Sequence, residues 1–503
     1  MLTRSFRMGA LALAFYLLPQ GGVAQVIVPV TLTLEQAIDI ARQNNPGLQA
    51  ARNDADLANW NVRSAYGAMF PSASVNGGIS WQGAGEQQFG SLTAEQLGFA
   101  NQPSFLFSNY SLNLDYQING RTLMAPGQAK ANRVATQAQM VWTEATLVFQ
   151  ITQGYLEVLR QIEQVRVSEQ QRERANFNLR LATARLEVGT ASGVDVAQAE
   201  VAVGRAEVTI LQTANALETA QIRLLQQMGT DIDSPFVPTS PFRLSEPLWD
   251  REELYQLGLD SNPNLRSLRA SRSASSYGVR MAKSAYLPSL RLGASTSGFT
   301  RQASSTALNV QQAELQAMSS VQNCLLFNDL YSLLPTPRPP QNCSSFQFTD
   351  AQAQAIKDGN TGFPFSFTGQ PASLQLSISL PLPLFQGLSR QRQITEARVQ
   401  LDDLDINLRE QELGIRADIA TMLATVRAAY QVALLEEQNQ TVVDEQLRLA
   451  TERFTVGLAD FLELLEAETL KVEADREQIA AIFAYHESLA NLEAIVGTSI
   501  RTP

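Results

Sequence analysis

Hydrophobic positions recur at helical spacing along two very long stretches of the chain. Between Gly127 and Val188, apolar or small residues alternate in steps of four and three, a spacing typical of a helix that packs along a seam. These positions are Val134, Ala138, Val141, Ala145, Val148, Thr152, Tyr155, Leu159 and Ile162. A second stripe at Trp142, Phe149 and Leu156 indicates neighbours on two sides. A helix of about 60 residues is roughly 90 Å long, so it must form part of a larger coiled-coil assembly.

The same pattern follows Gly387, and each long helix stops at a glycine. Its apolar positions are Ile394, Ala397, Leu401, Leu404, Leu408, Ile415, Ile419, Met422, Val426, Ala429 and Ala433. Gly189 and Gly457 break the two helices, and further helices are predicted to return from Ala191 to Met228 and from Ala459 to Val496. The sequence therefore predicts two long helical hairpins.

Alternation with a period of two predicts four strands, two ahead of each long helix. Pro71 and Pro288 stop the preceding helices and mark the transitions from helix to strand. The predicted strands are Ser72–Gln82, Tyr110–Ile118, Ser289–Thr300 and Ser373–Leu380. Long loops, from about 83 to 109 and from about 301 to 372, join the two members of each pair.

Two short helices are predicted ahead of each strand pair. Thr33 and Asp250 each offer a side-chain oxygen as a helix cap, with Gln or Glu three residues later. Asn45-Pro46 and Asn262-Pro263 then provide a capping asparagine followed by proline at the first helical position. These second helices are expected to run to about Phe70 and Leu287.

These landmarks show that the chain contains an internal duplication. Asn45-Pro46 recurs at Asn262-Pro263, an offset of 217 residues, and Met228-Gly229-Thr230 recurs as Val496-Gly497-Thr498, an offset of 268. The second copy is thus 51 residues longer, and most of the excess falls in the 301–372 loop. The predicted organisation is a first repeat at 25–230, a linker at 231–248 with four prolines, and a second repeat at 249–503.

The amino terminus has the pattern of a secretory signal peptide at residues 1–24. Arg4 and Arg7 precede the apolar run Met8–Leu18, and Gly22-Val23-Ala24 supplies small residues for cleavage. A short retained anchor is the alternative. No other run of about 18 apolar residues follows, so a helical membrane span is not expected.

Charge and cysteine content fit an exported protein. The formal charge of −11 argues against nucleic acid as a partner. Cys324 and Cys343 flank a proline-rich stretch within the 301–372 loop and predict one disulfide. With His486 as the single histidine, no metal site, cofactor or catalytic constellation is expected, so the chain does not read as an enzyme.

In the order and duplication of these features, the chain resembles the TolC-like outer-membrane efflux proteins, or outer membrane factors. The resemblance rests on the two Asn-Pro helix starts, the Ala285–Leu290 run Ala-Tyr-Leu-Pro-Ser-Leu, and Arg-x-x-x-Gly turns followed by acidic residues. It implies a mainly α fold in which three copies form a periplasmic helical tunnel and share a twelve-stranded β-barrel in the bacterial outer membrane. It also implies an exit channel for efflux or type I secretion, served by a periplasmic adaptor and an inner-membrane pump.

The resemblance also assigns candidate gate residues. Glu463 and Glu466 match two aspartates that line the periplasmic entrance in the best-known member, and threefold symmetry would make six carboxylates in a ring that favours cations. Asp195 matches an acidic residue that helps to latch that entrance. Its expected tyrosine and arginine partners are replaced by Phe454 and Ala459, so any latch must use other contacts.

An ordinary solvated helix face is the alternative for these acidic residues, and it is the expected role of Glu468 and Glu473. The turns themselves are candidate docking sites for the adaptor, although glycine geometry and helix capping explain the same residues. The turn residues are Arg185, Val188, Gly189, Thr190, Arg453, Val456, Gly457 and Leu458.

The same sequence features also fit functions other than a channel. A periplasmic or surface coiled-coil scaffold or adhesin would use the strands only to oligomerise. An enzyme would use the acidic residues as acid and base, and the 301–372 loop would also suit a surface receptor. Conductance, outer-membrane fractionation and a trimeric mass discriminate the channel from the others.

Overall fold

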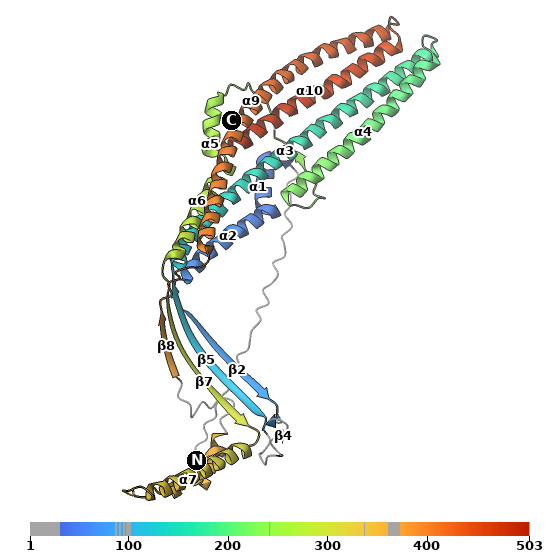
Figure 1. Cartoon of the computed structure of the whole chain (residues 1–503). Coiled ribbons are helices and arrows are strands. Elements are labelled where there is room, and N and C mark those ends of the chain that lie inside the picture. The colour runs from blue at the N-terminus through green and yellow to red at the C-terminus, as the bar shows by residue number, and fades with distance from the viewer. Residues whose placement is uncertain are drawn as a thin grey trace, which may run out of the picture. The chain divides into compact units, whose positions relative to one another are not determined.

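The computed structural model describes residues 31–85, 88–89, 92–93, 96, 102–240, 242–336, 338–360 and 373–501 (Figure 1). The segment assigned to the signal peptide lies outside these residues. The chain divides into two compact units, one comprising Met1–Asn59, Ala131–Ala274 and Leu401–Pro503, and the other Trp60–Lys130 and Ser275–Gln400. The elements follow the predicted order twice, so the mainly helical fold with a strand contribution is confirmed.

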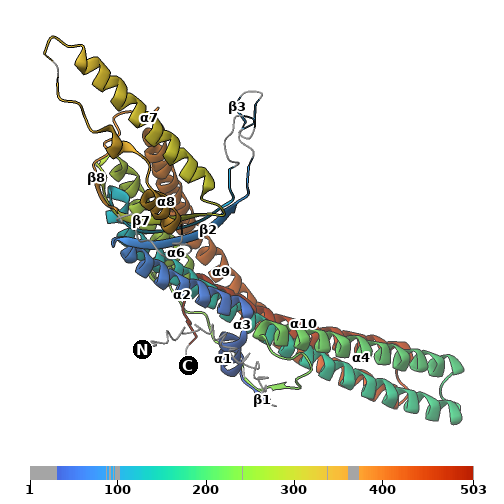
Figure 2. The ribbon, with the colours of Figure 1, turned by 90° about the horizontal axis from the view of Figure 1, so that it is seen from below.

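Two helical hairpins dominate the first unit and lie side by side in both views (Figures 1 and 2). They consist of α3 (Gly120–Glu187) with α4 (Gly193–Met228), and α9 (Ser389–Thr455) with α10 (Phe461–Val496). The predicted start of the first long helix was wrong, because the Asn119 side chain accepts a hydrogen bond from the Thr122 N–H and caps the helix there. Among the described residues, no helix has the length and apolar character needed to cross a bilayer.

Two short helices precede each strand pair, as predicted. They are α1 (Leu34–Asn44), α2 (Pro46–Gly67), α5 (Arg251–Ser261) and α6 (Pro263–Lys283), the last extended by the 3-10 turn η1 (Ser284–Tyr286). Thr33 and Gln36 form the expected capping box. The expected Asp250 cap was wrong, since its side chain makes no capping hydrogen bond; Glu252 and Glu253 instead place negative charge at the start of α5.

The two asparagines that open α2 and α6 also join these helices to the ends of the return helices. Asn45 accepts from the Leu48 N–H at 3.1 Å and donates to the Gln227 carbonyl at 2.8 Å. In the second copy, Asn262 accepts from Leu265 at 2.9 Å and donates to Ile495 at 2.7 Å. The landmarks repeated at offsets 217 and 268 are therefore physical neighbours in each copy.

Each repeat builds its own apolar core, and the cores match position by position. Both combine the short helices with one hairpin. At the 268-residue offset, the buried pairs are Leu147 with Ile415, Ile151 with Ile419, Val158 with Val426, and Leu224 with Leu492. The duplication predicted from turn residues thus extends to the side chains that hold each copy together.

Two buried tyrosines hold the linker between the repeats against these cores. The Tyr155 hydroxyl donates to the Leu32 carbonyl and accepts from the N–H groups of Thr239 and Ser240. The Tyr485 hydroxyl donates to the Ser245 carbonyl at 2.6 Å. Strands β1 (Thr31–Leu32) and β6 (Val237–Pro238) pair in parallel within the same region.

The second unit contains a four-stranded antiparallel sheet in the order β2-β5-β7-β8. Its strands are β2 (Ser72–Gln82), β5 (Phe105–Ile118), β7 (Leu290–Ala303) and β8 (Ser373–Ser379), and a small separate pair joins β3 (Gln88–Phe89) to β4 (Leu92–Thr93). Pro71 and Pro288 stand just before β2 and β7. β5 begins at Phe105, so the first inter-strand loop is shorter than predicted.

The register separates the sheet into two chemically different faces, because directly paired residues lie on the same face. One face, here the apolar face, carries Val75, Ile79, Trp81, Leu112, Leu114, Leu292, Ala294, Leu374, Leu376 and Ile378. The other, the polar face, carries Ser74, Asn76, Ser80, Asn109, Ser111, Asn113, Asp115, Ser295, Ser297, Gln375 and Ser377, with Phe105, Phe107 and Phe299 toward the end of the sheet at which β5 begins. Every residue of β2 is exposed.

The segment predicted as a long loop at 301–372 was wrong in its local structure, because much of it is helical. It contains α7 (Ala307–Ser332), the 3-10 turn η2 (Cys343–Phe346) and α8 (Asp350–Gly359). Cys324 of α7 and Cys343 of η2 form a disulfide, with their Cα atoms 5.6 Å apart. We call residues 304–360 the insert.

The single histidine is buried between the linker and the second core. The His486 ring meets the Phe242 ring at a tilt and the Tyr485 ring edge to face, with centroids 5.3 and 5.0 Å away, and its Nε2 has no hydrogen-bond partner among the described residues. Burial, with a smaller contribution from the Arg501 charge, lowers the pKa of His486 to about 4. The imidazole is therefore neutral at pH 7.

We expect acid to destabilise the fold through this residue. The unfolded chain gains a proton near pH 6.5, whereas the folded chain gains it only near pH 4, so stability falls as the pH drops through this window, by up to about 3 kcal/mol. Thermal unfolding in detergent at pH 7 and pH 4.5 measures the effect. His486→Phe should flatten this part of the profile, whereas equal pH slopes for both proteins would contradict the assignment. Burial raises the pKa of Glu487, an effect of opposite sign that both proteins share.

Candidate functional site: the hairpin turns

The two hairpin turns have the same backbone geometry. Gly189 and Gly457 adopt left-handed conformations, with φ of 79° and 82°. The Thr190 N–H donates to the Arg185 carbonyl, and the Leu458 N–H donates to the Arg453 carbonyl, both at 2.8 Å. These are Schellman motifs, in which the arginine contributes only its backbone carbonyl to the turn. Both guanidinium groups therefore remain available for other contacts.

Arg185 uses its guanidinium to join one hairpin to the other. Its Nη1 donates to the Phe454 carbonyl at 2.6 Å, its Nη2 donates to the Thr190 carbonyl at 3.2 Å, and the group lies 4.3 Å from the centre of the Phe454 ring. The first carbonyl belongs to the end of α9, which is the negative end of that helix dipole. One side chain therefore fixes its own turn and the neighbouring helix end together.

An apolar cluster lies beneath this contact and combines all four helices. Its buried members are Ala182, Ala199, Phe454, Phe461 and Leu464. The rings of Phe454 and Phe461 meet edge to face at 5.7 Å, and Ala459 packs against the cluster. Phe454 and Ala459, which lack the polar groups expected from the family resemblance, therefore contribute to apolar packing between the hairpins.

A second polar contact joins the hairpins further from the turns. Glu468 of α10 binds Arg174 of α3 at 2.9 Å and accepts from Asn178 at 3.2 Å. The interpretation of Glu468 as a solvated residue was wrong, since its side chain is only 15% exposed. No local pattern predicts this pair, because its members are 294 positions apart and carry no motif.

Asp195 lies at the start of α4, where it forms a capping box with Ser192. Its carboxylate accepts from the Ser192 N–H at 2.7 Å and from the Ser192 hydroxyl at 2.9 Å. The Ser192 side chain in turn accepts from the Asp195 N–H. These bonds position the carboxylate at the helix terminus.

Glu463 and Glu466 have different electrostatic surroundings. Glu463 forms an ion pair with Arg453 of the same hairpin at 3.0 Å, which offsets its charge. Glu466 is exposed and forms no ion pair within the described part of the chain. If the two carboxylates face a pore, Glu466 supplies the uncompensated charge.

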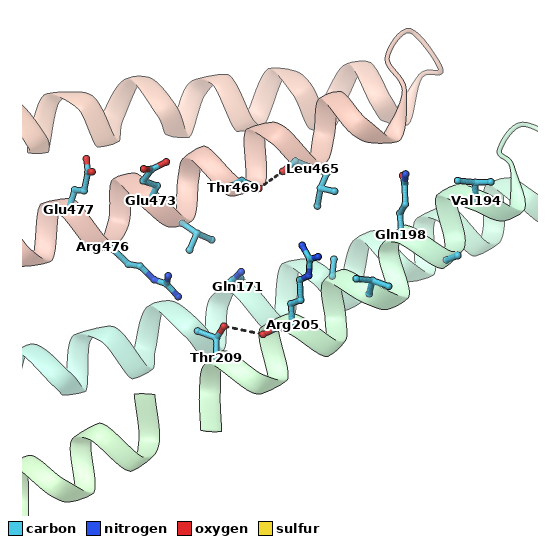
Figure 3. A pocket seen from close by; sticks show the side chains of 14 residues that line it. Gln171, Val194, Gln198, Arg205, Thr209, Leu465, Thr469, Glu473, Arg476 and Glu477 are labelled. Carbon is cyan, nitrogen blue, oxygen red and sulfur yellow. Dashed lines mark hydrogen bonds between the residues drawn. The ribbon is translucent and has the colours of Figure 1, made fainter. Parts of the chain in front are cut away.

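A groove of about 810 Å³ lies between α4 and α10, with Gln171 of α3 at its base (Figure 3). Arg205 points from α4 toward α10, and Arg476 points from α10 toward α4. Neither arginine forms an ion pair with another described residue. The walls also carry Glu473, Glu477 and apolar residues, so the groove combines charges of both signs with apolar surface.

The turns expose apolar side chains to solvent at their outermost positions. Val188 and Leu458 are each 73% exposed, and Val456 is 69% exposed. Large apolar side chains gathered at two adjacent turns are typical of a protein contact surface. The predicted tip residues are thus brought together in space, as two neighbouring turns of one unit.

We expect Arg185→Ala to loosen the two turns from each other. The change removes two hydrogen bonds from a charged donor and one cation–π contact, a loss on the order of 2 kcal/mol. Pulsed EPR between spin labels at Thr190→Cys and Leu458→Cys should show a broader distance distribution. Arg453→Ala is the matched control, because its ion pair stays within one hairpin; equal broadening in both variants would contradict the role of Arg185.

Comparison with known proteins places this architecture among outer-membrane channels. The chain is 22% identical over 440 residues to the pyoverdine export outer membrane protein OpmQ of Pseudomonas putida, covering 85% of this chain and 84% of that protein. It is 23% identical over 263 residues to outer membrane protein TolC of Vibrio cholerae, covering 52% of this chain and 56% of that protein.

Solved structures share the fold at lower identity. The outer membrane protein VceC of Vibrio cholerae gives a TM-score of 0.65 at 16% identity, covering 93% of this chain and 97% of that chain. CusC gives a TM-score of 0.66 at 15% identity, covering 99% of both chains. The family model described as Outer membrane efflux protein matches residues 37–230 and 349–498. Because this match covers more than half of its length, the chain belongs to the outer membrane efflux protein family.

Proposed function

We propose that three copies of this chain form the outer-membrane exit channel of a tripartite efflux or type I secretion system. Members of its family are outer-membrane efflux channels, and the protein is accordingly an outer-membrane protein. In the proposed assembly, the sheets of three copies close one twelve-stranded barrel, and the hairpins form a tunnel in the periplasm. Substrates cross passively after an inner-membrane pump and an adaptor deliver them.

The two-faced open sheet is the observation that carries this proposal. Its apolar face suits lipid, and its polar face suits a water-filled lumen. Among the residues that the structure describes, β2 and β8 each pair on one side only. A sheet in lipid must satisfy all of its backbone hydrogen bonds, which four strands achieve only by pairing with other copies.

The helical hairpins supply the tunnel in this proposal. α3 contains 68 residues and is therefore about 100 Å long. Its apolar residues include Val134 and Val141, which are 50% and 43% exposed in a single copy. Packing against neighbouring copies would bury such positions, as the long seams in the sequence require.

The exposed turns are the proposed contact with the periplasmic adaptor. Val188, Val456 and Leu458 offer an apolar surface that one copy leaves uncovered. Arg185 holds the two turns in one arrangement, so an adaptor that binds both would recognise their relative position. Energy for transport would come from the inner-membrane pump.

A coiled-coil scaffold or adhesin is the alternative function, and the sheet argues against it. Strands that served only to oligomerise would not need a continuous apolar face with residues such as Trp81, Leu376 and Ile378, which are 67%, 74% and 79% exposed. The same face is what a lipid-exposed strand requires.

We expect the purified protein to have the mass of three copies and to conduct ions in planar lipid bilayers. Native mass spectrometry in detergent and single-channel recording test the two properties separately. Heat-unfolded protein is the control for the conductance. A trimer without conductance would favour the scaffold, and a monomer would contradict the shared barrel.

We also expect Glu466→Ala to reduce cation preference more than Glu463→Ala does, because Arg453 already offsets the Glu463 charge. The double variant should show the largest shift in reversal potential under a salt gradient and should lose block by multivalent cations. Glu466→Asp keeps the charge and is the matched control. Unchanged selectivity in the double variant would remove both residues from the pore.

A further inference from the structure

The C-terminal end of α7 carries an apolar stripe that no described residue of the same chain covers. Leu326 and Leu330 lie four residues apart on one side of the helix with Phe327 beside them, and Leu333 and Leu334 follow directly after the helix ends at Ser332. All five side chains are exposed, with Leu330 at 54% and Leu333 at 82%. An isolated helix does not need such a stripe, so the pattern points to a partner helix.

The insert itself holds the opposite side of α7. Cys324 is buried and disulfide-bonded to Cys343, and the Asn328 side chain both donates to and accepts from the backbone of Gln341. These residues lie on the other side of the helix from Leu330. The apolar stripe is therefore turned away from the rest of the insert and held in that orientation.

The insert is fixed to the end of the sheet by hydrogen bonds at both of its ends. The Asn360 side chain accepts from the Ala303 N–H at 2.7 Å and donates to the Ala303 carbonyl at 2.8 Å. The Ser304 N–H donates to the Ser104 carbonyl at 2.8 Å. Figure 1 shows α7 crossing the end of the strands rather than continuing their direction.

Residues of both faces are buried at this end of the sheet, among them Ser108 of the apolar face at 2% exposed. By register, Phe105 and Ala303 lie on the polar face, and they are only 3% and 5% exposed. Arg301 stacks on the Phe105 ring, 3.6 Å from its centre. In the proposed channel the polar face lines the lumen, so the insert starts at the outer rim of the lumen.

We propose that the three copies of α7 pack against one another through this apolar stripe and form a helical cap over the outer mouth of the channel. The inference rests on the trimer of the proposed function. In this cap, the apolar stripe of each α7 is covered by α7 of another copy.

Reach and symmetry support this arrangement. A twelve-stranded barrel has a diameter of roughly 24 Å, whereas the 26 residues of α7 span about 39 Å. A helix of this length can reach the barrel axis from any point on the rim. Since every copy of α7 follows directly from a β7 strand of the shared sheet, closing the sheet brings the three helices to the same end of one barrel.

Charge argues against an anionic lipid surface as the cover of the stripe. α7 contains the acidic residues Glu314 and Asp329 and no lysine or arginine. A helix that bound lipid phosphates would need basic side chains beside its apolar stripe. Packing with an identical helix requires only the apolar seam.

Photo-crosslinking tests the cap directly. A benzoylphenylalanine side chain replaces Leu330 in one variant and Ser332 in the other; both positions are exposed, and they lie on opposite sides of α7. After irradiation of the outer-membrane protein, the Leu330 variant should give about tenfold more covalent dimer and trimer, because only contacting side chains react. Native mass spectrometry of unirradiated protein reports the trimer independently.

The outcomes separate this inference from the channel itself. Self-crosslinks confined to the Leu330 variant, in protein that is trimeric, support the cap. Trimeric protein whose Leu330 variant crosslinks only to lipid or to another protein, or no more than the Ser332 variant, overturns the cap and leaves the channel standing. Protein that is not trimeric overturns both.

Discussion

Backbone hydrogen bonding in lipid is the constraint on which the rest of this molecule depends. Each N–H and C=O in the hydrocarbon layer needs a partner, and within the described part of the chain the edges of the sheet at β2 and β8 have none. The chain is therefore incomplete as a membrane structure until other copies close the sheet. In the proposed trimer, that closure also arranges the helices, the turns and the insert around one axis.

In the helical unit, two sets of contacts hold the two long hairpins in a fixed arrangement. Near the short helices, Asn45 joins the start of α2 to the end of α4, and Asn262 joins the start of α6 to the end of α10. At the turns, Arg185 and the Phe454–Phe461 pair connect one repeat to the other. The first contacts are duplicated and operate within a repeat, whereas the turn contacts are asymmetric. The contacts within each repeat are thus the same in both copies, whereas the contacts between the two repeats use residues that differ between the copies.

The scaffold can be predicted from the sequence because its signals are local. Helix periodicity, strand alternation, the Asn-Pro starts and the turn glycines each depend on a few neighbouring residues, and the structure confirms the elements they predict. The helices of the insert have no such local signal, since α7 has apolar residues spread around much of its circumference and its N-cap residue Thr306 makes no capping hydrogen bond. The cap at Asn119 was missed because Pro126 and Gly127 resemble a helix start.

The candidate site was only partly accessible for a related reason. Gly189, Gly457 and their arginines follow from one motif, but the Arg185–Phe454 and Arg174–Glu468 contacts join residues far apart in the chain. Nothing in the spacing of Glu463 and Glu466 shows that Arg453 offsets only one of them. Pairings between repeats are set by how two hairpins pack, and that information is absent from any single segment.

The double hydrogen bond between Asn360 and Ala303 has a consequence for how such a chain can change over generations. It brings the far end of the insert back to the residue at which β7 ends, so the insert spans almost no distance between its two attachments. A segment of this kind can lengthen, shrink or be exchanged for another without altering the register of β7 against β5 and β8. The outer surface of the protein can therefore vary under selection while the membrane-embedded sheet stays constant.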